Sequence, residues 1–274
     1  MRSYYQKRCC LIQNLWVSAA FLFVLVAAVS APRANGQMAA GTANDNQWHW
    51  DLSLPAWGPA IDGTISFSGI PPQKVEASLS DIVKNLNFAL IGQAEGRRNH
   101  LGFGSNLLYM SLEADVPTSG PILGQTNPRA NVKALIAEGF GFYRLTTSGS
   151  EPYNQSFADL ILGARYVGMQ AQIKGDAASS SKRTFNFVDG LAGVRGYAGL
   201  GKTWGLRGRV DVATFGSDVT WNLEGSLAWR ASQRWTIDGG YRSLDIDYDK
   251  GQGTDRKILN LKIFGPVITF RFVS

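Results

Sequence analysis

The chain contains very little cysteine and histidine. Among its 274 residues there are two cysteines and two histidines. Cys9 and Cys10 stand together near the start, so the rest of the chain can form no disulfide and no thiolate metal site. His49 and His100 are too few for a metal cluster or a catalytic triad. We therefore expect a protein that is not an enzyme, with no catalytic residues, no metal and no cofactor.

Long apolar runs are absent after residue 36. No stretch there approaches roughly 18 consecutive apolar residues, so the sequence predicts no transmembrane helix in this part. Without helices, only strands that satisfy one another's backbone groups can cross a bilayer. Alternating strands are therefore the one way in which this part of the chain could be held in a membrane.

The first 36 residues have the organisation of a secretory signal peptide. Three basic residues stand among the first eight, and an apolar segment follows at 15–29, which is short for a membrane span. Small residues come next, and we expect cleavage between Ala31 and Gly36. The sequence thus predicts a signal peptide over 1–36, export through the periplasm, and one domain over 37–274.

Removal of that segment changes the charge balance. The whole chain has 27 Lys and Arg against 21 Asp and Glu, a formal net charge of +6. The segment contains four basic residues and no acidic one, so 27 − 4 = 23 bases remain against 21 acids, a net charge of +2. So small a charge gives no support to a nucleic-acid partner, and we expect none.

What the sequence has in abundance is alternation with a period of two. Over 206–212 apolar residues alternate with Arg207, Arg209 and Asp211, and 219–229 alternates in the same way. This period belongs to β-strands. A soluble sheet buries its apolar face, whereas a bacterial outer-membrane barrel turns that face to lipid and lines its lumen with the polar one.

Ten segments have strand character and are separated by turn residues, as in a meander. They lie at 48–54, 86–96, 100–114, 131–146, 157–173, 186–199, 203–215, 219–230, 234–247 and 258–272. Counted from a periplasmic N-terminus, the inner connections are mostly short, while the outer ones at 116–130, 174–185 and 248–257 are long and polar. The sequence therefore predicts an all-β fold: a transmembrane antiparallel up-and-down β-barrel of about ten strands, with eight or twelve as alternatives.

The aromatic residues gather towards two rims. Trp48, Trp204, Trp229, Trp235, Phe270 and Phe272 fall beside the short inner connections, and Tyr166, Trp221 and Tyr241 fall towards the outer rim. Aromatic girdles of this kind mark the two interfaces of a bilayer. The sorting favours an outer-membrane barrel over a soluble sandwich. Its expected partners are outer-membrane lipid and the export and barrel-insertion machinery, and we expect a monomer.

Three places do not fit a single strand face. Lys262 and Phe270 fall on the same face of the last strand, which suggests a bulge at 265–266. The segment 241–248 changes its polar face midway. Glu138 lies in phase with apolar neighbours, and because a carboxylate facing lipid is unfavourable, we place it inside and expect a bulge in the segment 131–146, without assigning its position.

Residues 55–86 do not follow the meander. The alternating piece at 63–69 either extends the first strand or begins an extra hairpin. Residues 78–86 have apolar residues at helical spacing, and Ser78 with Asp81 suits a capping pair. We expect a short helix in the first connection, which either enters the lumen or lies on the outer rim.

Several short motifs carry a family resemblance. They are Phe187–Gly190, Leu206–Val212 with Phe215–Gly216 and Thr220–Trp221, Gly240–Tyr248, Gly265–Phe272 and, upstream, Asp81–Phe88 and Tyr166. With them the chain resembles a family of exported bacterial outer-membrane β-barrel proteins, mostly uncharacterised and similar to OmpA-type and opacity-type barrels. The resemblance covers nearly all of 37–274 and implies the fold and the compartment, not an activity. Such barrels typically end on Phe, whereas here Val273 and Ser274 follow Phe272.

Eleven charged residues fall on the predicted inner face. They are Glu95, Glu138, Arg165, Asp189, Arg195, Arg207, Arg209, Asp211, Glu224, Asp238 and Arg242. About ten strands leave a lumen that side chains nearly fill, and buried charges need partners, so we expect Arg207 or Arg209 to pair with Glu224 or Asp189. The sequence favours a structural or surface-interaction barrel with a charged, largely filled lumen. A narrow porin-like passive pore for small polar solutes or ions is the alternative, and an outer-membrane hydrolase is the least favoured because no histidine falls at the outer rim.

Overall fold

The computed structural model describes residues 46–66, 72–115, 129–149, 156–174 and 181–274. The predicted signal peptide and most of the predicted long connections at 116–130 and 174–185 lie outside these residues. Within the described part, no helix is long and apolar enough to cross a membrane.

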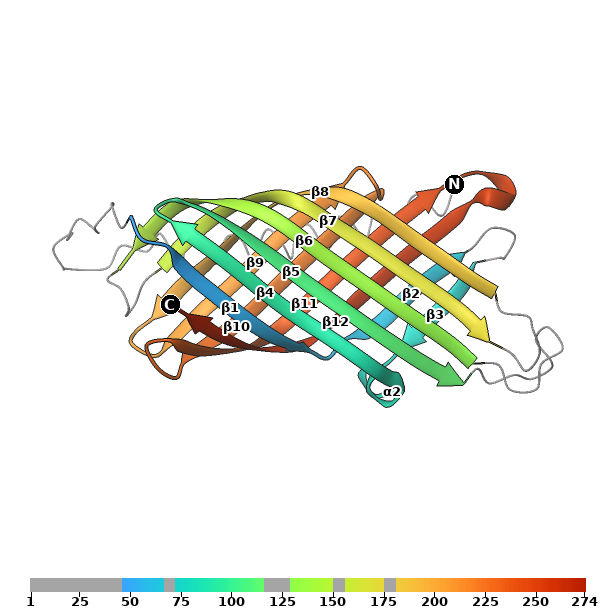
Figure 1. Cartoon of the computed structure of the whole chain (residues 1–274), viewed down its shortest axis with the longest axis horizontal. Helices are drawn as coiled ribbons and strands as arrows, with labels where there is room; N and C mark the ends of the chain where they lie inside the picture. The colour runs from blue at the N-terminus through green and yellow to red at the C-terminus, as the bar shows by residue number, and fades with distance from the viewer. Residues whose placement is uncertain (1–45, 67–71, 116–128, 150–155, 175–180) are drawn as a thin grey trace.

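Ten antiparallel strands form a closed barrel (Figure 1). They are β1 (His49–Trp57), β4 (Leu86–Arg98), β5 (Leu101–Asp115), β6 (Arg129–Ser148), β7 (Ser156–Lys174), β8 (Ser181–Leu200), β9 (Trp204–Thr214), β10 (Val219–Arg230), β11 (Trp235–Lys250) and β12 (Lys257–Val273). Each strand pairs with the next in this order, and β12 returns to β1, with Asp51 opposite Val273 and Trp57 opposite Val267. The prediction of a ten-stranded up-and-down barrel is confirmed, and every predicted strand overlaps an observed one.

Two further strands, β2 (Ala60–Ser66) and β3 (Gln73–Ala77), form a hairpin next to the barrel wall. β2 continues the line of β1 along β12, pairing Ala60 with Phe264 and Ser66 with Ile258, and β3 pairs with β2. The segment that was expected either to extend the first strand or to begin a hairpin therefore does both.

A short helix, α2 (Leu79–Asn85), connects β3 to β4, as predicted for the first connection. A capping box closes its first turn: the Asp81 N–H donates to Ser78 Oγ at 3.2 Å, and the Ser78 N–H donates to the Asp81 carboxylate at 3.0 Å. Asp81 is exposed, and the hydrogen bonds from Ser78 hold the pKa of its carboxyl below the usual value because they favour the ionised form. A single 3₁₀ turn, η1 (Gly253–Asp255), follows β11.

The two ends of the barrel differ in their connections. At one end, which we call the turn end, β4–β5, β8–β9 and β10–β11 are joined by residues 99–100, 201–203 and 231–234. Asn99 and Gly201 have φ of 55° and 85°, which tight turns require. The C-terminus lies at this end as well (Figure 1). The opposite end, which we call the loop end, carries the β5–β6 and β7–β8 connections, and such asymmetry is typical of transmembrane barrels.

The outer surface near the turn end is apolar. Of the residues predicted for the inner girdle, Trp48, Trp204, Trp229, Trp235 and Phe270 are 44 to 52 % exposed and Phe272 is partly covered. Of those predicted for the outer rim, which lie farther from the turn end, Tyr241 is 51 % exposed, and Tyr166 and Trp221 are partly covered. Trp229 stands opposite Trp204 in the ladder, and the Trp235 and Phe272 rings pack edge to face with centroids 5.2 Å apart. So much half-exposed apolar surface indicates contact with lipid.

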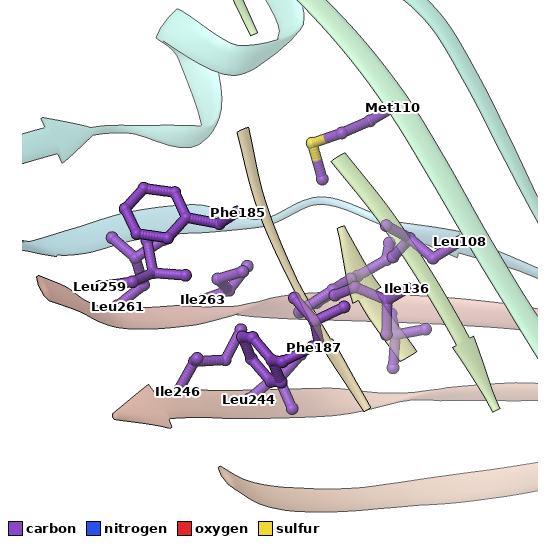
Figure 2. Close-up of a cluster of buried hydrophobic side chains, with 13 residues drawn as sticks. Leu108, Met110, Ile136, Phe185, Phe187, Leu244, Ile246, Leu259, Leu261 and Ile263 are labelled. Carbon is purple, nitrogen blue, oxygen red and sulfur yellow. The ribbon is translucent and has the colours of Figure 1, made fainter. Parts of the chain in front are cut away.

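The interior of the barrel towards the loop end is apolar too. Figure 2 shows the side chains that converge there from opposite walls. The fully or almost fully buried ones are Leu108, Met110, Ile136, Val167, Phe185, Phe187, Leu244, Ile246, Leu259, Leu261 and Ile263. On the outside of the same part of β12, Asn260 and Lys262 are exposed. Along β12 the loop-end half is thus polar outside and apolar inside, whereas on β4 the outward Phe88 and Leu90 are 54 % and 50 % exposed.

This exchange of polar and apolar faces explains why the last strand needs no bulge between Lys262 and Phe270. β12 pairs with β11 in one unbroken register from Lys257 to Phe272, so the bulge expected at 265–266 is absent. Lys262 and Phe270 do share the outer face. They differ because Phe270 lies in the apolar band near the turn end, whereas Lys262 lies on the polar outer surface near the loop end.

The expected face change at 241–248 is wrong for the same reason. Arg242, Leu244 and Ile246 are all buried on the inner face, and the residues between them are partly exposed on the outer face. The side-chain phase is constant, and only its polarity changes along the strand.

Glu138 lies inside the barrel, as expected, and β6 has an irregularity in its pairing with β7, but between Arg144 and Thr146, where it does not separate Glu138 from its apolar neighbours in phase. β6 keeps one register with β5 throughout and with β7 from residue 129 to Arg144. Phe140 and Phe142, which share the phase of Glu138, are 5 % and 4 % exposed and point inward as well. Apolar residues in phase with an inner charge fill the lumen here instead of facing lipid.

Candidate functional site: the ionic interior

Charged side chains fill the lumen towards the turn end. One row of ladder partners runs from Asn106 on β5 through Glu138 on β6 and Arg165 on β7 to Asp189 on β8. Partners that stand opposite one another in a ladder point to the same face of the sheet, so these four side chains share the inner face. The eleven charged residues predicted to face inward all occupy inner positions of the barrel.

Four of them form a closed ring of ion pairs, which we call the central cluster: Glu138, Arg165, Arg209 and Asp211. Arg165, 0 % exposed, donates from Nε to Glu138 at 2.7 Å and from a terminal nitrogen to Asp211. Arg209 donates to the other oxygen of each carboxylate, at 2.8 Å to Glu138 and 2.7 Å to Asp211. Each guanidinium therefore bridges both carboxylates, and each carboxylate receives both guanidiniums.

Amide and hydroxyl groups complete the coordination of the central cluster. Asn106 donates to Glu138 at 2.7 Å, Asn222 donates to Asp211 at 2.9 Å, and Arg165 donates to the Thr220 hydroxyl at 3.1 Å. A buried ion pair repays its desolvation only when its geometry is good and its remaining polar atoms are satisfied. These conditions are met by the central cluster.

A second set of ion pairs lies closer to the turn end. Asp159 accepts from Arg144 at 2.8 Å and from Arg195 at 3.2 Å, and Arg195 also pairs with Glu95 across the barrel. The Arg195 guanidinium lies 4.3 Å from the centroid of the Phe142 ring, which adds a cation–π contact. Arginines and aromatic rings therefore pack together in this part of the lumen.

The opposite wall carries a third set. Arg207 pairs with Asp238 at 3.0 Å, and Arg271 pairs with Asp238 at 3.4 Å and with Asp51 at 2.7 Å. Of the residues in these sets, the sequence prediction did not include Asp51, Arg144, Asp159 and Arg271. The alternation of the sequence could have predicted an inward position for Arg271, because it stands between two outward-facing aromatic residues, Phe270 and Phe272.

The expected pairing of Arg207 or Arg209 with Glu224 or Asp189 is wrong. Both arginines use other carboxylates, because their long side chains reach across two or three strands in so narrow a tube. The Asp189 carboxylate instead accepts the N–H groups of Gly216 and Ser217 at 2.9 and 2.7 Å, which anchors the β9–β10 connection.

Glu224 and Arg242 stand apart from the ion-pair sets. Glu224 is the ladder partner of Arg209 on one side and of Arg242 on the other. Within the described residues, neither Glu224 nor Arg242 has an oppositely charged group at ion-pair distance. Arg242 donates from Nε to the Asn222 amide oxygen at 2.9 Å, and its guanidinium carbon lies 4.9 Å from the centroid of the Trp57 ring.

The two histidines lie near the turn end. A ring nitrogen of His100 lies 3.0 Å from the Arg144 carbonyl oxygen, and the ring stacks on Tyr143. His49 stands opposite Arg97 in the ladder. In the part of the chain that the structure describes, no three His, Cys, Asp or Glu side chains are grouped so that they could hold a metal ion.

An apolar outer band, an aromatic girdle and a charged lumen in a closed antiparallel barrel together define a transmembrane β-barrel of the outer-membrane type. No protein-family model matches the sequence, and no curated protein matches it significantly. Solved structures of similar fold include the outer membrane protease OmpT of Escherichia coli, with 8 % identity over 83 % of this chain and 96 % of that one, and a TM-score of 0.44.

Two further similar structures are the transport unit of the autotransporter AIDA-I of Escherichia coli and the attachment invasion locus protein Ail of Yersinia pestis. The first is 10 % identical over 93 % of this chain and 96 % of that one, with a TM-score of 0.40. The second, solved with a heparin analogue, is 10 % identical over 82 % of this chain and 99 % of that one, with a TM-score of 0.35.

Proposed function

We propose that this chain is an integral outer-membrane barrel with a structural or surface-interaction role and a lumen that solutes do not cross. The observation that carries this proposal is the burial of the central cluster: Arg165 is 0 % exposed, and Asp211 and Glu138 are 1 % and 5 % exposed. A barrel of about ten strands is close to the size at which side chains just fill the interior.

The same proposal includes the route to the membrane. The basic and apolar pattern of residues 1–36 directs export through the periplasm, and the insertion machinery places the domain in the outer membrane as a monomer in contact with lipid. The loop-end half, which is polar outside, then projects beyond the bilayer and presents its connections to the surroundings. A rigid, closed barrel is a suitable support for such a surface.

Planar-bilayer recording of the refolded protein tests the closed lumen. We expect no stable unitary conductance from the parent, and unitary steps from the double variant Glu138→Ala/Arg165→Ala. This variant removes one charge of each sign and leaves Arg209 paired with Asp211. Lys74→Ala/Glu76→Ala removes an exposed ion pair on β3 and is the matched control, expected to stay silent.

A stable conductance in the parent would overturn the closed lumen in favour of a narrow passive pore for small polar solutes or ions. Such a pore would have to pass the central cluster, so its conductance would then change in the Glu138→Ala/Arg165→Ala variant and not in the control.

A further inference from the structure

The apolar face of α2 is only partly covered by the barrel. Leu79, Ile82, Val83 and the C-cap residue Leu86 have the spacing of one helix face. Ile82 is buried, and a Cβ built on Gly58, just after β1, would lie 3.0 Å from the Leu79 side chain, so one edge of this face packs on the barrel. Val83, at the other edge, is 61 % exposed. The helix therefore presents apolar surface away from the barrel.

This apolar surface continues the apolar band of the barrel. The first outward side chains of β4 are Leu86, Phe88 and Leu90, and all three are exposed. No polar side chain interrupts the outward, even-numbered positions of β4 over 86–96. Leu54, on the neighbouring β1, is exposed as well. The surface that faces lipid near the turn end thus reaches α2 without a break.

The opposite face of α2 is polar. Ser80, Asp81 and Lys84 are exposed, and Asp81 is held by the capping box with Ser78. A helix with one apolar and one polar face suits the boundary between acyl chains and headgroups, where each face meets a matching medium. Figure 1 shows α2 at the side of the barrel, short of the loop-end tip of β5.

A second apolar projection lies across the barrel, in the connection between β9 and β10. β9 is the fifth strand after β4 in the ten-stranded order, so this connection and α2 lie on opposite walls. In Figure 1 the connection is the orange loop at the upper margin, at a similar level along the barrel to α2 at the lower margin. Phe215, in this connection, is 83 % exposed, the highest value among the large apolar side chains that the structure describes.

The backbone of this connection is held in an unfavourable conformation. Phe215 has a φ of 105°, which residues with a side chain rarely adopt. The buried Asp189 carboxylate holds the following residues: it accepts the N–H groups of Gly216 and Ser217 at 2.9 and 2.7 Å and the Ser217 hydroxyl at 2.7 Å. A Cβ built on Gly190, an outward position of β8, would lie 2.8 Å from the Phe215 ring. The connection therefore holds an aromatic ring on the outer surface of the wall.

We propose that α2 and Phe215 mark the outer boundary of the bilayer on opposite walls of the barrel, each inserting apolar side chains where acyl chains meet headgroups. This inference rests on the proposed membrane position of the barrel. Lipid is the partner because the apolar face of α2 is continuous with the band that faces lipid. A second copy of the chain, joined through one self-complementary patch, does not cover two opposite walls. Two apolar projections at one level fix the depth at which the barrel sits.

Site-directed spin labelling of the full chain, refolded into phosphatidylcholine vesicles, tests this proposal. Cys9→Ser/Cys10→Ser removes the native cysteines, and single labels are placed at Val83→Cys and Phe215→Cys. Collisions of each label with oxygen, which concentrates among acyl chains, are compared with collisions with a water-soluble nickel chelate. We expect both positions to have an oxygen-to-nickel ratio severalfold above that of Lys84→Cys, the matched control on the polar face of α2.

Two positions on β12 calibrate the measurement. Ile268→Cys, in the apolar band, should favour oxygen, and Lys262→Cys, on the polar outer surface, should favour the nickel chelate. If Ile268→Cys favours the nickel chelate, the membrane position of the barrel fails and the boundary fails with it. If Ile268→Cys favours oxygen while Val83→Cys and Phe215→Cys behave like Lys262→Cys, the boundary alone is overturned.

A label at residue 215 replaces a side chain with positive φ, so Val188→Cys is a second probe of that wall. Val188 occupies an outward position of β8, is 56 % exposed and leaves Phe215 in place. It should favour oxygen as well, and a preference for the nickel chelate at both Val188→Cys and Phe215→Cys overturns the role of the β9–β10 connection. Few collisions with either reagent at Val83→Cys or Phe215→Cys would mean that protein covers the surface, which overturns lipid as the partner. A normal heat-modifiable gel shift shows that each variant has folded.

Discussion

The two halves of this barrel fill their interiors with different side chains, charged ones towards the turn end and apolar ones towards the loop end. Near the turn end, charges such as those of Glu138 and Arg165 are buried inside, and Ile268 and Phe270 face outward. Near the loop end, Leu261 is buried inside and Lys262 faces outward on the same strand. Along β11 and β12 the side chains keep one continuous phase, and only the polarity of the two faces is exchanged between the halves.

The comparison teaches that a change in the polar face of a strand does not by itself indicate a change of register. A strand that leaves the bilayer keeps its phase, but its outer face must then suit water, and the inner face can be built from apolar residues. Among the described residues, the ion pairs inside the lumen lie in the half whose exterior is apolar, whereas those at the loop end, such as Arg256 with Asp249, are on the surface. In the turn-end half the sequence alternates as strongly as in the other half, but with inverted polarity.

The largest effect that can test the comparison is expected inside the turn-end half. Glu138→Ala leaves Arg165 and Arg209 with one carboxylate between them in a buried site, which should cost about 3–5 kcal/mol of unfolding free energy. Denaturant unfolding in detergent measures it. Glu76→Ala breaks an exposed pair with Lys74 on β3 and should leave the midpoint unchanged, because solvent screens such pairs.

If Glu138→Ala unfolded at the parent's midpoint, the central cluster would be a hydrated set of charges instead of a packed plug. The contrast between an ionic and an apolar interior would then be a contrast between a wet and a dry one, and the alternative of a narrow pore would gain support.

A smaller effect is expected on the outer surface, where the comparison concerns lipid and water. Ile268→Arg places a charge in the apolar band and should destabilise the barrel in lipid vesicles by about 2–4 kcal/mol if the site lies near the bilayer midplane. Asn260→Arg makes the same change in side-chain charge on the same face of β12, but beside Lys262, and should have little effect. Unfolding of both variants from vesicles gives the difference, and equal losses would contradict the placement of the loop-end half in water.

Much of this architecture can be predicted from local alternation. The ten strands and the capping box of Ser78 and Asp81 depend on residues close in sequence, and the sequence shows them directly. The partners of the inner charges cannot be predicted in this way, because they are distant in sequence: Arg195 pairs with Glu95, a hundred positions away. Such contacts depend on the width of the lumen and the reach of each side chain, which alternation does not encode.

The early end of the β1–β4 pairing, at Ser53 and Gln93, could not be predicted either, although one signal for it is present. Pro55 lies in β1, in the part that has lost its β4 partner. Proline has no N–H to donate and is tolerated in strands that have a free edge. Read alone, Pro55 marks only the end of a strand, because the continuation of β1 into β2 past Gly58 is a property of the assembled sheet.

The smallest effect concerns α2, which connects β3 to β4, and it tests whether this part of the molecule meets water. Asp81 is fully exposed, and its hydrogen bonds from Ser78 lower its pKa below the usual 3.8. A lowered pKa means that the carboxylate stabilises the helix start fully above that usual value and loses this effect as the pH falls through the lower, folded pKa. Amide exchange over residues 78–86 should therefore be slower in the parent than in Asp81→Asn at neutral pH. When both proteins are compared at the same pH, the difference should disappear under strongly acidic conditions. A difference that persists there would mean that the carboxylate is shielded from water, which would place α2 deeper in the lipid than the comparison of the two halves implies.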